Sequence, residues 1–496
     1  MLKGENRAWY AAFQSKDARF DGHFFVGVSS TGIYCRPVCR ARLPKAENCT
    51  FYATAAEAEQ AGFRPCLLCR PELAPGTAPI DASASLAHRA ARFLEENCGS
   101  IESLEEPARH FGCSSRHLRR AFTEEYNVSP IQYLQTCRLL LAKSLLTDTD
   151  LSVTGVAMAA GFGSLRRFNE LFKGRYRLAP TVLRREAAGM KVQGGDITLS
   201  MGYRPPYQWQ QMLDFLALRA VPGVEKIQNG EYWRTVHLVD GNRRHLYGWI
   251  RVGHRAHENL LTVTVDSALL PVLPQMLSRV RRLFDLYCDP DTIYKGLASM
   301  NTIRPGLCVP GARLPGCFDA FEMTVRAVLG QQITVKAAST LAGRFAAAYG
   351  IPVQTGIEGL THAFPSPEAV MGLDGPIESH LGPLGITAAR AKTILELARR
   401  LMQGTMDFDF NVRPDTEIKK LKEIPGIGDW TAQYIVMRAM GWPDAFPYTD
   451  YGVKKALAPR TSKEILALAE TWRPWRSYAT IHLWNSLRVT SFEEKI

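Results

Sequence analysis

Four cysteines near the N-terminus constrain this chain more than any other feature. Cys35 and Cys39 lie in TGIYCRPVCRAR, and Cys66 and Cys69 lie in GFRPCLLCRP, so the spacing is C-x3-C followed by C-x2-C. Two close pairs joined by a loop can fold around one tetrahedral ion, and four thiolates favour Zn²⁺. The spacing therefore predicts one zinc ion, for which a purely structural role is the ordinary interpretation.

Arginines crowd the sequence around these cysteines. They are Arg36, Arg40, Arg42, Arg64 and Arg70. Guanidinium groups bind phosphate oxygens through paired hydrogen bonds, so this set is suited to phosphate recognition. A zinc-bound thiolate stays ionised and nucleophilic at neutral pH, and it would capture an electrophilic alkyl group held over it. Spacing alone favours a structural role for the metal, whereas the arginines favour a reactive one.

The charge of the whole chain favours a polyanionic partner. The 496 residues carry 60 Lys and Arg against 48 Asp and Glu, a formal net charge of +12, for which a solvated basic surface is the alternative explanation. No apolar run reaches the ~18 residues of a membrane-spanning helix, and MLKGENRAWY lacks the apolar core of a signal peptide. We therefore expect a cytoplasmic protein without membrane contact, whose cysteines are thiols or metal ligands.

Two stretches rich in Pro, Ala, Ser or Gly, 71–85 and 187–196, are predicted linkers. Periodicity predicts helices between them. The region after the second stretch mixes a helix (WQQMLDFLALRAV) with strand-like runs such as LLTVTVD, and later segments are amphipathic helices. The sequence therefore predicts a multidomain α+β protein. The expected domains are a small zinc-bound α/β module (1–75), an all-α domain (83–187), a small α+β subdomain (197–283) and a helical domain (284–490).

Two helix-turn-helix patterns follow one another within 83–187. The first turns at Gly112 and the second near Gly161 and Gly163, and a basic helix follows each turn. Such second helices can lie in the major groove of DNA. The basic side chains are Arg116, Arg119 and Arg120 in the first unit, and Arg166 and Arg167 in the second. A solvated helix face is the alternative, but two patterns in tandem favour DNA binding.

The segment LKEIPGIGDWTAQYIVMRAM (421–440) predicts a hairpin between two helices. Gly426 and Gly428 permit a tight turn, and the backbone N–H groups that follow, as far as Thr431, are suited to bind a DNA phosphate without reading sequence. PGIG alone is a common turn. Asp450 follows in DAFPYTDYGVKKAL, where its carboxylate either has a functional role or caps the next helix.

The first 75 residues resemble the N-terminal domain of the Ada family of methylation-repair proteins, through TGIYCRPVCRAR and NCTFYATAAEAEQAGFRPCLLCRP. The resemblance implies that Cys35 takes a methyl group irreversibly from a DNA methylphosphotriester, with Cys39, Cys66 and Cys69 as the other zinc ligands. It also implies DNA contacts by Thr31, Arg40, Arg42 and Arg64. The helical pair, down to its closing RYRLAPTVLRR, resembles the AraC-type DNA-binding domain.

Residues from about 200 to 490 resemble the AlkA-type 3-methyladenine DNA glycosylases of the helix-hairpin-helix superfamily. The resemblance runs through YRPPYQWQQMLDFLALRAV, RPGLCVPGARLPGCFDAFEMTVRAVLGQQIT and the hairpin. It implies that Asp450 is the essential carboxylate and that a monovalent cation binds at the hairpin carbonyls. The aromatic residues implied to line a pocket for a flipped base are Phe215, Trp430, Tyr434 and Trp484, for which ordinary core packing is the alternative.

Two features of this region differ from the patterns of related glycosylases. The residue after LGQ, which in the family wedges into the vacated base stack, is the polar Gln332 where AlkA-type enzymes have an apolar side chain. Glycosylases of the superfamily that also nick DNA carry a lysine on or just after the hairpin, and GIGDWTAQY has none. We therefore expect a monofunctional hydrolase that leaves an abasic site.

Together these motifs predict a DNA repair enzyme joined to a methylation-responsive transcription activator. The expected activities are base excision by a 3-methyladenine DNA glycosylase and a stoichiometric methyltransferase reaction at Cys35. The expected partners are alkylated double-stranded DNA, promoter DNA and RNA polymerase, and the expected state is a monomer. The alternative is a DNA-binding transcription regulator with a structural zinc ion and an inactive glycosylase-like half.

Overall fold

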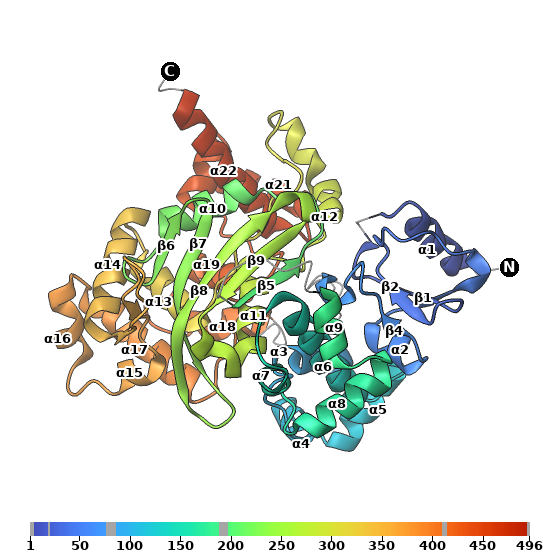
Figure 1. Cartoon of the computed structure of the whole chain (residues 1–496). Coiled ribbons are helices and arrows are strands. Elements are labelled where there is room, and N and C mark those ends of the chain that lie inside the picture. Colours follow the sequence, from blue (N-terminus) through green and yellow to red (C-terminus); the bar gives the residue numbers. More distant parts are fainter. Residues whose placement is uncertain (1–3, 18–19, 76–85, 188–196, 409–413, 494–496) are drawn as a thin grey trace. The chain divides into compact units, whose positions relative to one another are not determined.

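The computed structural model describes residues 4–17, 20–75, 86–187, 197–408 and 414–493 (Figure 1). The chain divides into two compact units. Unit 1 comprises Met1–Pro205 and Leu238–Ser278, and unit 2 comprises Pro206–His237 and Arg279–Ile496. No helix among the described residues is long and apolar enough to cross a membrane.

The first part of unit 1 is a four-stranded sheet with the order β3-β1-β2-β4. Its elements are α1 (Gly4–Gln14), β1 (Phe25–Val28), β2 (Ile33–Cys35), β3 (Cys49–Tyr52), α2 (Ala55–Gln60) and β4 (Arg64–Pro65). Trp9, Phe24 and Phe51 pack together on the sheet, with Trp9 and Phe24 stacked at 5.3 Å between ring centroids. Because β2 and β4 pair in parallel, Tyr34 lies opposite Pro65. The next residues of the two strands, Cys35 and Cys66, therefore lie side by side at the same edge of the sheet.

The helical part of unit 1 contains both predicted helix-turn-helix pairs. Its helices are α3 (Leu86–Glu96), α4 (Glu105–His110), α5 (Ser115–Tyr126), α6 (Pro130–Asp148), α7 (Val153–Ala159), α8 (Leu165–Tyr176) and α9 (Pro180–Ala187). The turns predicted at Gly112 and Gly161 are confirmed, since both glycines have a positive φ of 63° and 81°. Ser114 and Ser164 then cap α5 and α8 by accepting N–H groups of the first turn, so each pair contains an independent start signal for its second helix.

One buried carboxyl group links the small sheet to these helices within unit 1. Glu59 of α2 accepts hydrogen bonds from Tyr34 in β2 at 3.1 Å, Thr136 in α6 at 2.9 Å and Tyr176 in α8 at 3.5 Å. Burial raises the pKa of Glu59 to about 7, because an ionised carboxylate is disfavoured away from water. The residue that precedes Cys35 is thus hydrogen-bonded to the same side chain as the second basic helix.

The predicted mixture of helix and strand after residue 197 is confirmed. A five-stranded sheet has the order β5-β9-β8-β7-β6. Its strands are β5 (Ile197–Gly202), β6 (Glu225–Gln228), β7 (Glu231–Val239), β8 (His245–Arg255) and β9 (Leu260–Val265), with α10 (Trp209–Arg219) between β5 and β6. The predicted linkers fall mainly on 76–85 and 188–196, outside the described residues. The start of the first one, Pro71–Leu73, is a short 3-10 helix with Leu73 buried, so that part is not a linker.

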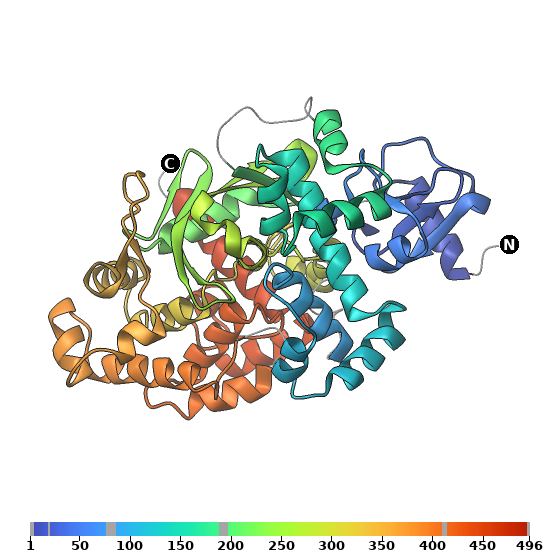
Figure 2. The ribbon, with the colours of Figure 1, turned by 60° about the horizontal axis from the view of Figure 1, so that its bottom comes forward.

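Unit 2 is mainly helical (Figure 2). Its principal helices are α11 (Leu273–Leu283, shared with unit 1), α12 (Pro290–Leu297), α13 (Ala320–Leu329), α14 (Val335–Tyr349), α15 (Pro367–Met371), α16 (Ile377–Leu381), α17 (Ala388–Met402), α18 (Pro414–Lys422), α19 (Asp429–Ala439), α20 (Tyr451–Ala456), α21 (Ser462–Ala469) and α22 (Arg476–Glu493). A short β10–β11 pair joins Ile351–Pro352 to His362–Ala363. Helix α13 is buried on most of its surface and contacts α14, α17 and α19, so it is the central helix of this unit.

The burial of His482 in α22 predicts an acid-sensitive unit 2. Burial lowers the pKa of this imidazole to about 4, and its Nε2 lies 3.6 Å from the Sγ of Cys308. In the unfolded chain His482 has its ordinary pKa of about 6.5, so it binds a proton at a higher pH than in the folded protein. The contribution of neutral, buried His482 to the free energy of unfolding is therefore complete above about pH 6.5 and is lost as the pH falls toward 4. Between about pH 7 and pH 5 the wild type should lose about 2 kcal/mol more stability than His482→Gln, measured by denaturant unfolding at each pH. Equal losses in the two proteins would contradict this prediction.

Candidate functional site

The four predicted ligands meet in one cluster. One sulfur from each of Cys35, Cys39, Cys66 and Cys69 lies within 4.8 Å of the other three. Cys35, Cys39 and Cys66 are buried and Cys69 is half-buried. Four sulfurs this close form the donor set of a tetrahedral zinc ion, and the parallel β2–β4 pair brings the two halves of the set together.

Backbone N–H groups contact these sulfurs unequally. The N–H of Arg36 donates to Cys69 Sγ at 3.3 Å, and backbone hydrogen bonds also reach Cys39 from Ala41 and Cys66 from Cys69. Among the described residues, no N–H group donates to the sulfur of Cys35. Hydrogen bonds to a thiolate withdraw electron density from it, so these contacts lower the nucleophilic character of the sulfurs that receive them.

Two of the five neighbouring arginines are not available to a phosphate. Arg36 is buried and pairs with Asp21, with Nε at 2.8 Å from Oδ1, and it also donates to the Cys69 carbonyl. Arg70 pairs with Glu72 at 2.9 Å and with Asp148 at 2.7 Å. The interpretation of these two as phosphate-binding residues is wrong, because both guanidinium groups are used inside the protein.

The residues implied to contact DNA beside the cluster are more accessible. Arg40, Arg42 and Thr31 are exposed, and Arg64 in β4 is half-buried. The Thr31 hydroxyl donates to the Val28 carbonyl at 3.2 Å, which fixes the turn before β2. The structure thus leaves the guanidinium groups of Arg40 and Arg42 exposed just after Cys39, and the Thr31 side chain exposed in the turn before β2.

The predicted basic residues of α5 and α8 all lie on exposed helix surface. Arg116, Arg119, Arg120, Arg166 and Arg167 are exposed. Two of them have acidic neighbours one turn later, Arg120 with Glu124 at 3.9 Å and Arg166 with Glu170 at 3.0 Å. Exposed pairs of this kind are weak, so a phosphate can compete for the same guanidinium groups.

In unit 2 a cavity of about 410 Å³ contains most of the residues predicted for the glycosylase site. Trp430, Tyr434, Asp450 and Trp484 line it. Trp430 and Tyr434 lie one turn apart on α19 with their rings stacked at 5.3 Å, and Trp484 comes from α22, with its ring centroid 6.2 Å from that of Tyr434. The helices after the hairpin therefore bring these aromatic residues to one wall.

The Asp450 carboxylate is fixed by three N–H groups. The indole N–H of Trp430 donates to Oδ2 at 3.0 Å and that of Trp484 donates to Oδ1 at 2.8 Å. Oδ1 also accepts the backbone N–H of Val453 at 3.1 Å, so Asp450 is the N-cap of α20 as well. A side chain at Gly452 would meet Trp484 at 2.7 Å, which leaves glycine as the residue that fits there. Capping and placement in the cavity are therefore compatible roles of one side chain.

Phe215 supports this cavity from behind. It is 1% exposed, stacks on Trp484 at 6.2 Å between ring centroids, and is not among the residues that line the cavity. Arg219 lies over its ring at 3.8 Å and Arg438 at 4.7 Å. Phe215 thus contacts the Trp484 indole and two guanidinium groups instead of lining the cavity itself.

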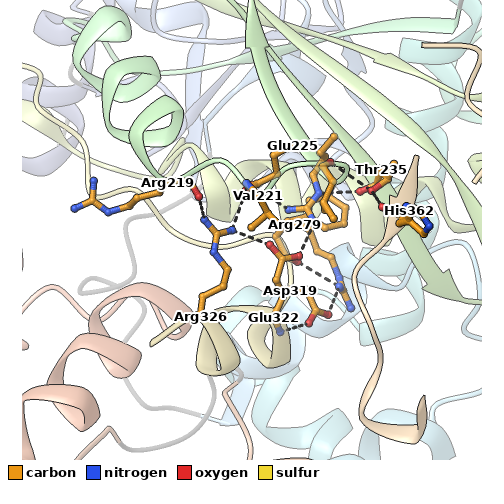
Figure 3. Close-up of polar contacts among 12 residues, drawn as sticks. Arg219, Val221, Glu225, Thr235, Arg279, Asp319, Glu322, Arg326 and His362 are labelled. Atoms are coloured by element: carbon orange, nitrogen blue, oxygen red, sulfur yellow. Dashed lines mark hydrogen bonds and ion pairs between the residues drawn. The ribbon is translucent and has the colours of Figure 1, made fainter. Parts of the chain in front are cut away.

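Three arginines in the cavity wall were missed by the sequence reasoning: Arg219, Arg326 and Arg438. They come from α10, α13 and α19, and no local motif brings them together. Figure 3 shows Arg326 within a network of buried charges that includes Glu225 and Glu322. Burial raises the pKa of Tyr434, but the charges on Arg438, Arg219 and Arg326 outweigh it and leave the pKa below its ordinary value.

The predicted hairpin is confirmed between α18 and α19. Gly426 has a φ of 91°, and a side chain there would lie 2.5 Å from the Thr393 hydroxyl. Gly428 is exposed and is the N-cap of α19, whereas Thr431 is buried. The side chain of Gln331 donates to the Gly426 carbonyl at 2.8 Å and to the Thr431 hydroxyl at 3.0 Å, so it joins the hairpin to the end of α13. Gln332 is exposed, with a positive φ of 56°.

Comparison with known families matches each part of the chain. Residues 8–72 match the metal binding domain of Ada, and 108–186 match a helix-turn-helix domain. Residues 198–319 match the AlkA N-terminal domain, and 325–462 match the HhH-GPD superfamily of base excision DNA repair proteins. The donor set and the family agree that the four-cysteine cluster is a zinc site.

Individual relatives extend this result to the whole chain. A protein of Mycobacterium tuberculosis named probable bifunctional transcriptional activator/DNA repair enzyme AlkA is 37% identical over 488 residues, which cover 96% of each chain. DNA-3-methyladenine glycosylase 2 of Escherichia coli is 36% identical over 285 residues, 58% of this chain and 96% of the relative. The solved 3-methyladenine DNA-glycosylase of Archaeoglobus fulgidus is 19% identical with a TM-score of 0.46, and the match covers 57% of this chain and 96% of that one.

The cysteine cluster predicts stoichiometric zinc. Cys66→Ala should reduce bound zinc from about one ion per chain to nearly none after dialysis against a chelator, because three thiolates cannot complete a closed structural site. Cys49→Ala is the control, since Cys49 is also buried in this module but donates its Sγ–H to the Lys45 carbonyl at 3.4 Å, outside the cluster. Elemental analysis of both purified variants measures the outcome. Full zinc content in Cys66→Ala would rule out the four-thiolate site.

Proposed function

This chain belongs to the family of AlkA-type bifunctional transcriptional activators and DNA repair enzymes, and we propose that it removes alkylated bases from DNA and senses DNA methylation. The observation that carries the glycosylase proposal is the Asp450 carboxylate, fixed by two indole N–H groups in an aromatic cavity. The nearby hairpin provides exposed backbone at Gly426 and Gly428 for a DNA phosphate. An inactive glycosylase-like half is disfavoured, because each of these parts is intact.

The cavity is suited to a base that has been rotated out of the duplex. Enzymes that act on a base must take it out of the stack to reach it. The faces of Trp430, Tyr434 and Trp484 provide stacking surface, and an alkylated purine with a positive charge is attracted to such faces by about 0.5–2 kcal/mol. Alkylation also makes the base a better leaving group, so the enzyme needs to stabilise the sugar more than to protonate the base.

Asp450 is proposed to stabilise the sugar as the base leaves. The bond between C1′ and the base nitrogen breaks, and its electron pair leaves with the base. The positive character that develops on the sugar is stabilised by the carboxylate, as in glycoside hydrolysis. Water then attacks C1′ and loses a proton, which yields the free base and an abasic site. The stretch 425–440 contains no lysine that could attack the sugar, so the proposed enzyme is monofunctional.

Cys35 is the proposed methyl acceptor. A zinc ion held by the four cysteines would keep their sulfurs ionised at neutral pH. The Cys35 sulfur attacks the methyl carbon of a methylphosphotriester, the carbon–oxygen bond breaks, and the phosphate oxygen keeps the electron pair. The lack of an N–H donor to this sulfur supports the assignment, as do exposed Arg40 and Arg42 nearby. The product is a stable thioether, so each protein molecule reacts once.

Methylation of Cys35 also changes the charge that faces DNA. Four thiolates around Zn²⁺ sum to minus two, and a thioether brings the sum to minus one. A less negative cluster repels phosphate less, so DNA affinity should rise. With the basic helices α5 and α8 in the same chain, this supports methylation-responsive binding to promoter DNA, and we propose that the DNA-bound protein contacts RNA polymerase. We also propose a monomer in the cytoplasm, and a monovalent cation at the hairpin carbonyls.

Replacement of Asp450 by Asn tests the glycosylase proposal. Asn still caps α20, but its amide cannot accept both indole N–H groups and carries no charge. Release of 3-methyladenine from methylated DNA should fall by about 100- to 1,000-fold, measured by chromatography of the free base. Asp429→Asn is the control, because Asp429 begins α19 and pairs with Lys422 at 3.2 Å without lining the cavity. Wild-type rates in Asp450→Asn would eliminate the proposed role.

Mass spectrometry tests the methyl transfer. Incubation with DNA that contains methylphosphotriesters should add one methyl group to the wild-type protein, located at Cys35 by peptide mapping. Cys35→Ala should take up none, while Cys49→Ala should react as the wild type does. Methylation of Cys69 instead of Cys35 would refute the residue assignment, and absence of any methylated product would refute the activity.

A further inference from the structure

One of the three cavity arginines is fully committed to holding the fold. Arg326 Nη1 pairs with Glu225 at 2.9 Å and with Glu322 at 2.8 Å, and its Nη2 donates to the Arg219 carbonyl at 2.6 Å. Figure 3 shows these contacts converging on Arg326, with the Arg219 side chain extending away from the network. The two carboxylates compensate the charge of Arg326, and the hydrogen bond to Arg219 joins the end of α10 to α13.

Arg438 is also used by the protein. It is 4% exposed, and its Nε and Nη2 donate to the carbonyls of Pro315 and Gly316 at 2.5 and 2.9 Å. Its Nη1 donates to the Tyr434 hydroxyl at 2.9 Å. Every nitrogen of this guanidinium therefore has a protein acceptor, and its effect on a ligand passes through Tyr434.

Arg219 is arranged differently from the other two. It lies at the last position of α10, is half-buried, and lines the cavity. The face of its guanidinium stacks on Phe215, with Cζ 3.8 Å from the ring centroid, and lies 5.8 Å from that of Trp484. Its Nη1 donates to the Phe215 carbonyl at 3.3 Å, and the guanidinium also hydrogen-bonds the side chain of Tyr434. A guanidinium has five N–H groups in its plane, so it can bind protein acceptors and still donate to a ligand.

The chemistry of a guanidinium distinguishes between alkylated purines. It donates hydrogen bonds and accepts none. An alkylated guanine presents a carbonyl oxygen at position 6, which accepts such a bond, whereas an adenine-type base presents an amino group there. In DNA, 7-methylguanine and 3-methyladenine both carry a positive charge, so repulsion by Arg219 acts on both and largely cancels in the comparison between them.

We propose that Arg219 is a specificity-determining residue, which donates from its cavity position to the 6-carbonyl oxygen of the bound base. The cavity then favours guanine-type and hypoxanthine-type bases over adenine-type bases. This inference rests on the proposed glycosylase function, since it assigns the base preference of that same site. Arg326 acts as a positioning residue, because its hydrogen bond holds the backbone carbonyl of Arg219 at the end of α10.

Competition within one substrate sample tests the proposal. Methylated DNA contains both 7-methylguanine and 3-methyladenine, and chromatography measures the initial rate of release of each by the full-length protein. Arg219→Met keeps a side chain over Phe215 but has no donor, and it should lower the ratio of 7-methylguanine to 3-methyladenine release by about tenfold. The ratio is independent of how much protein is folded, because both rates scale with the active fraction.

A neutral substrate separates hydrogen bonding from charge. Hypoxanthine has the 6-carbonyl group but no positive charge, so its release from a defined duplex should also fall about tenfold in Arg219→Met. Arg279→Met is the control, since Arg279 pairs with Asp319 at 2.9 Å and lies over Phe318, outside the cavity. It should leave all three rates within about twofold.

The outcomes distinguish the inference from the function on which it rests. A wild-type protein that releases none of these bases would refute the proposed glycosylase. A wild type that releases them, with an unchanged ratio in Arg219→Met, would refute the role of Arg219 alone. A fall in 7-methylguanine release without a fall in hypoxanthine release would also refute it, because a hydrogen bond to the 6-carbonyl requires both.

Discussion

The hydrogen bonds to Asp450 are the interaction on which the arrangement of the unit 2 cavity depends. A carboxylate in an aromatic wall is costly unless its oxygens find donors, and here Trp430, Trp484 and the N–H of Val453 supply them. These donors come from α19, α22 and α20, so one side chain ties three helices together at the cavity. The sequence left helix capping and a functional role as alternatives for Asp450. In the structure the capping hydrogen bond from Val453 is one of the contacts that orient its carboxylate.

Much of the architecture was predictable because it rests on local signals. The cysteine spacing predicts the metal cluster, and the glycines at 112, 161 and 426 predict turns that require a positive φ. The aromatic residues on α19 are one turn apart, so their shared face follows from helical periodicity. The turns and the aromatic face are each determined by residues within one short stretch, whereas the metal cluster combines two such stretches that the β2–β4 pair brings together.

Where the sequence misled, the reason was a partner distant in the chain. Arg36 and Arg70 adjoin the cysteines, but Asp21 and Asp148 neutralise them. No local motif marks Arg326, and its partner Glu225 lies about a hundred residues earlier in the chain. Charge pairing between distant segments is set by tertiary packing, which neither spacing nor periodicity encodes. The sequence therefore did not predict the arginines of the cavity, because they come together only when α10, α13 and α19 pack against one another.

The arginines determine the balance of charge in the cavity wall. Asp450 is the acidic residue among those that line it, beside three guanidinium groups. Glu225 and Glu322 offset the charge of Arg326. Arg438 donates a hydrogen bond to the Tyr434 hydroxyl. Burial raises the pKa of Tyr434, but the positive charge of Arg438 contributes to a net pKa below its ordinary value. The Asp450 carboxylate is thus the negative charge of the cavity wall, and the guanidinium groups of the same wall are hydrogen-bond donors. A cavity built only of aromatic rings would select for positive charge, whereas this one also selects for the position of an acceptor on the base.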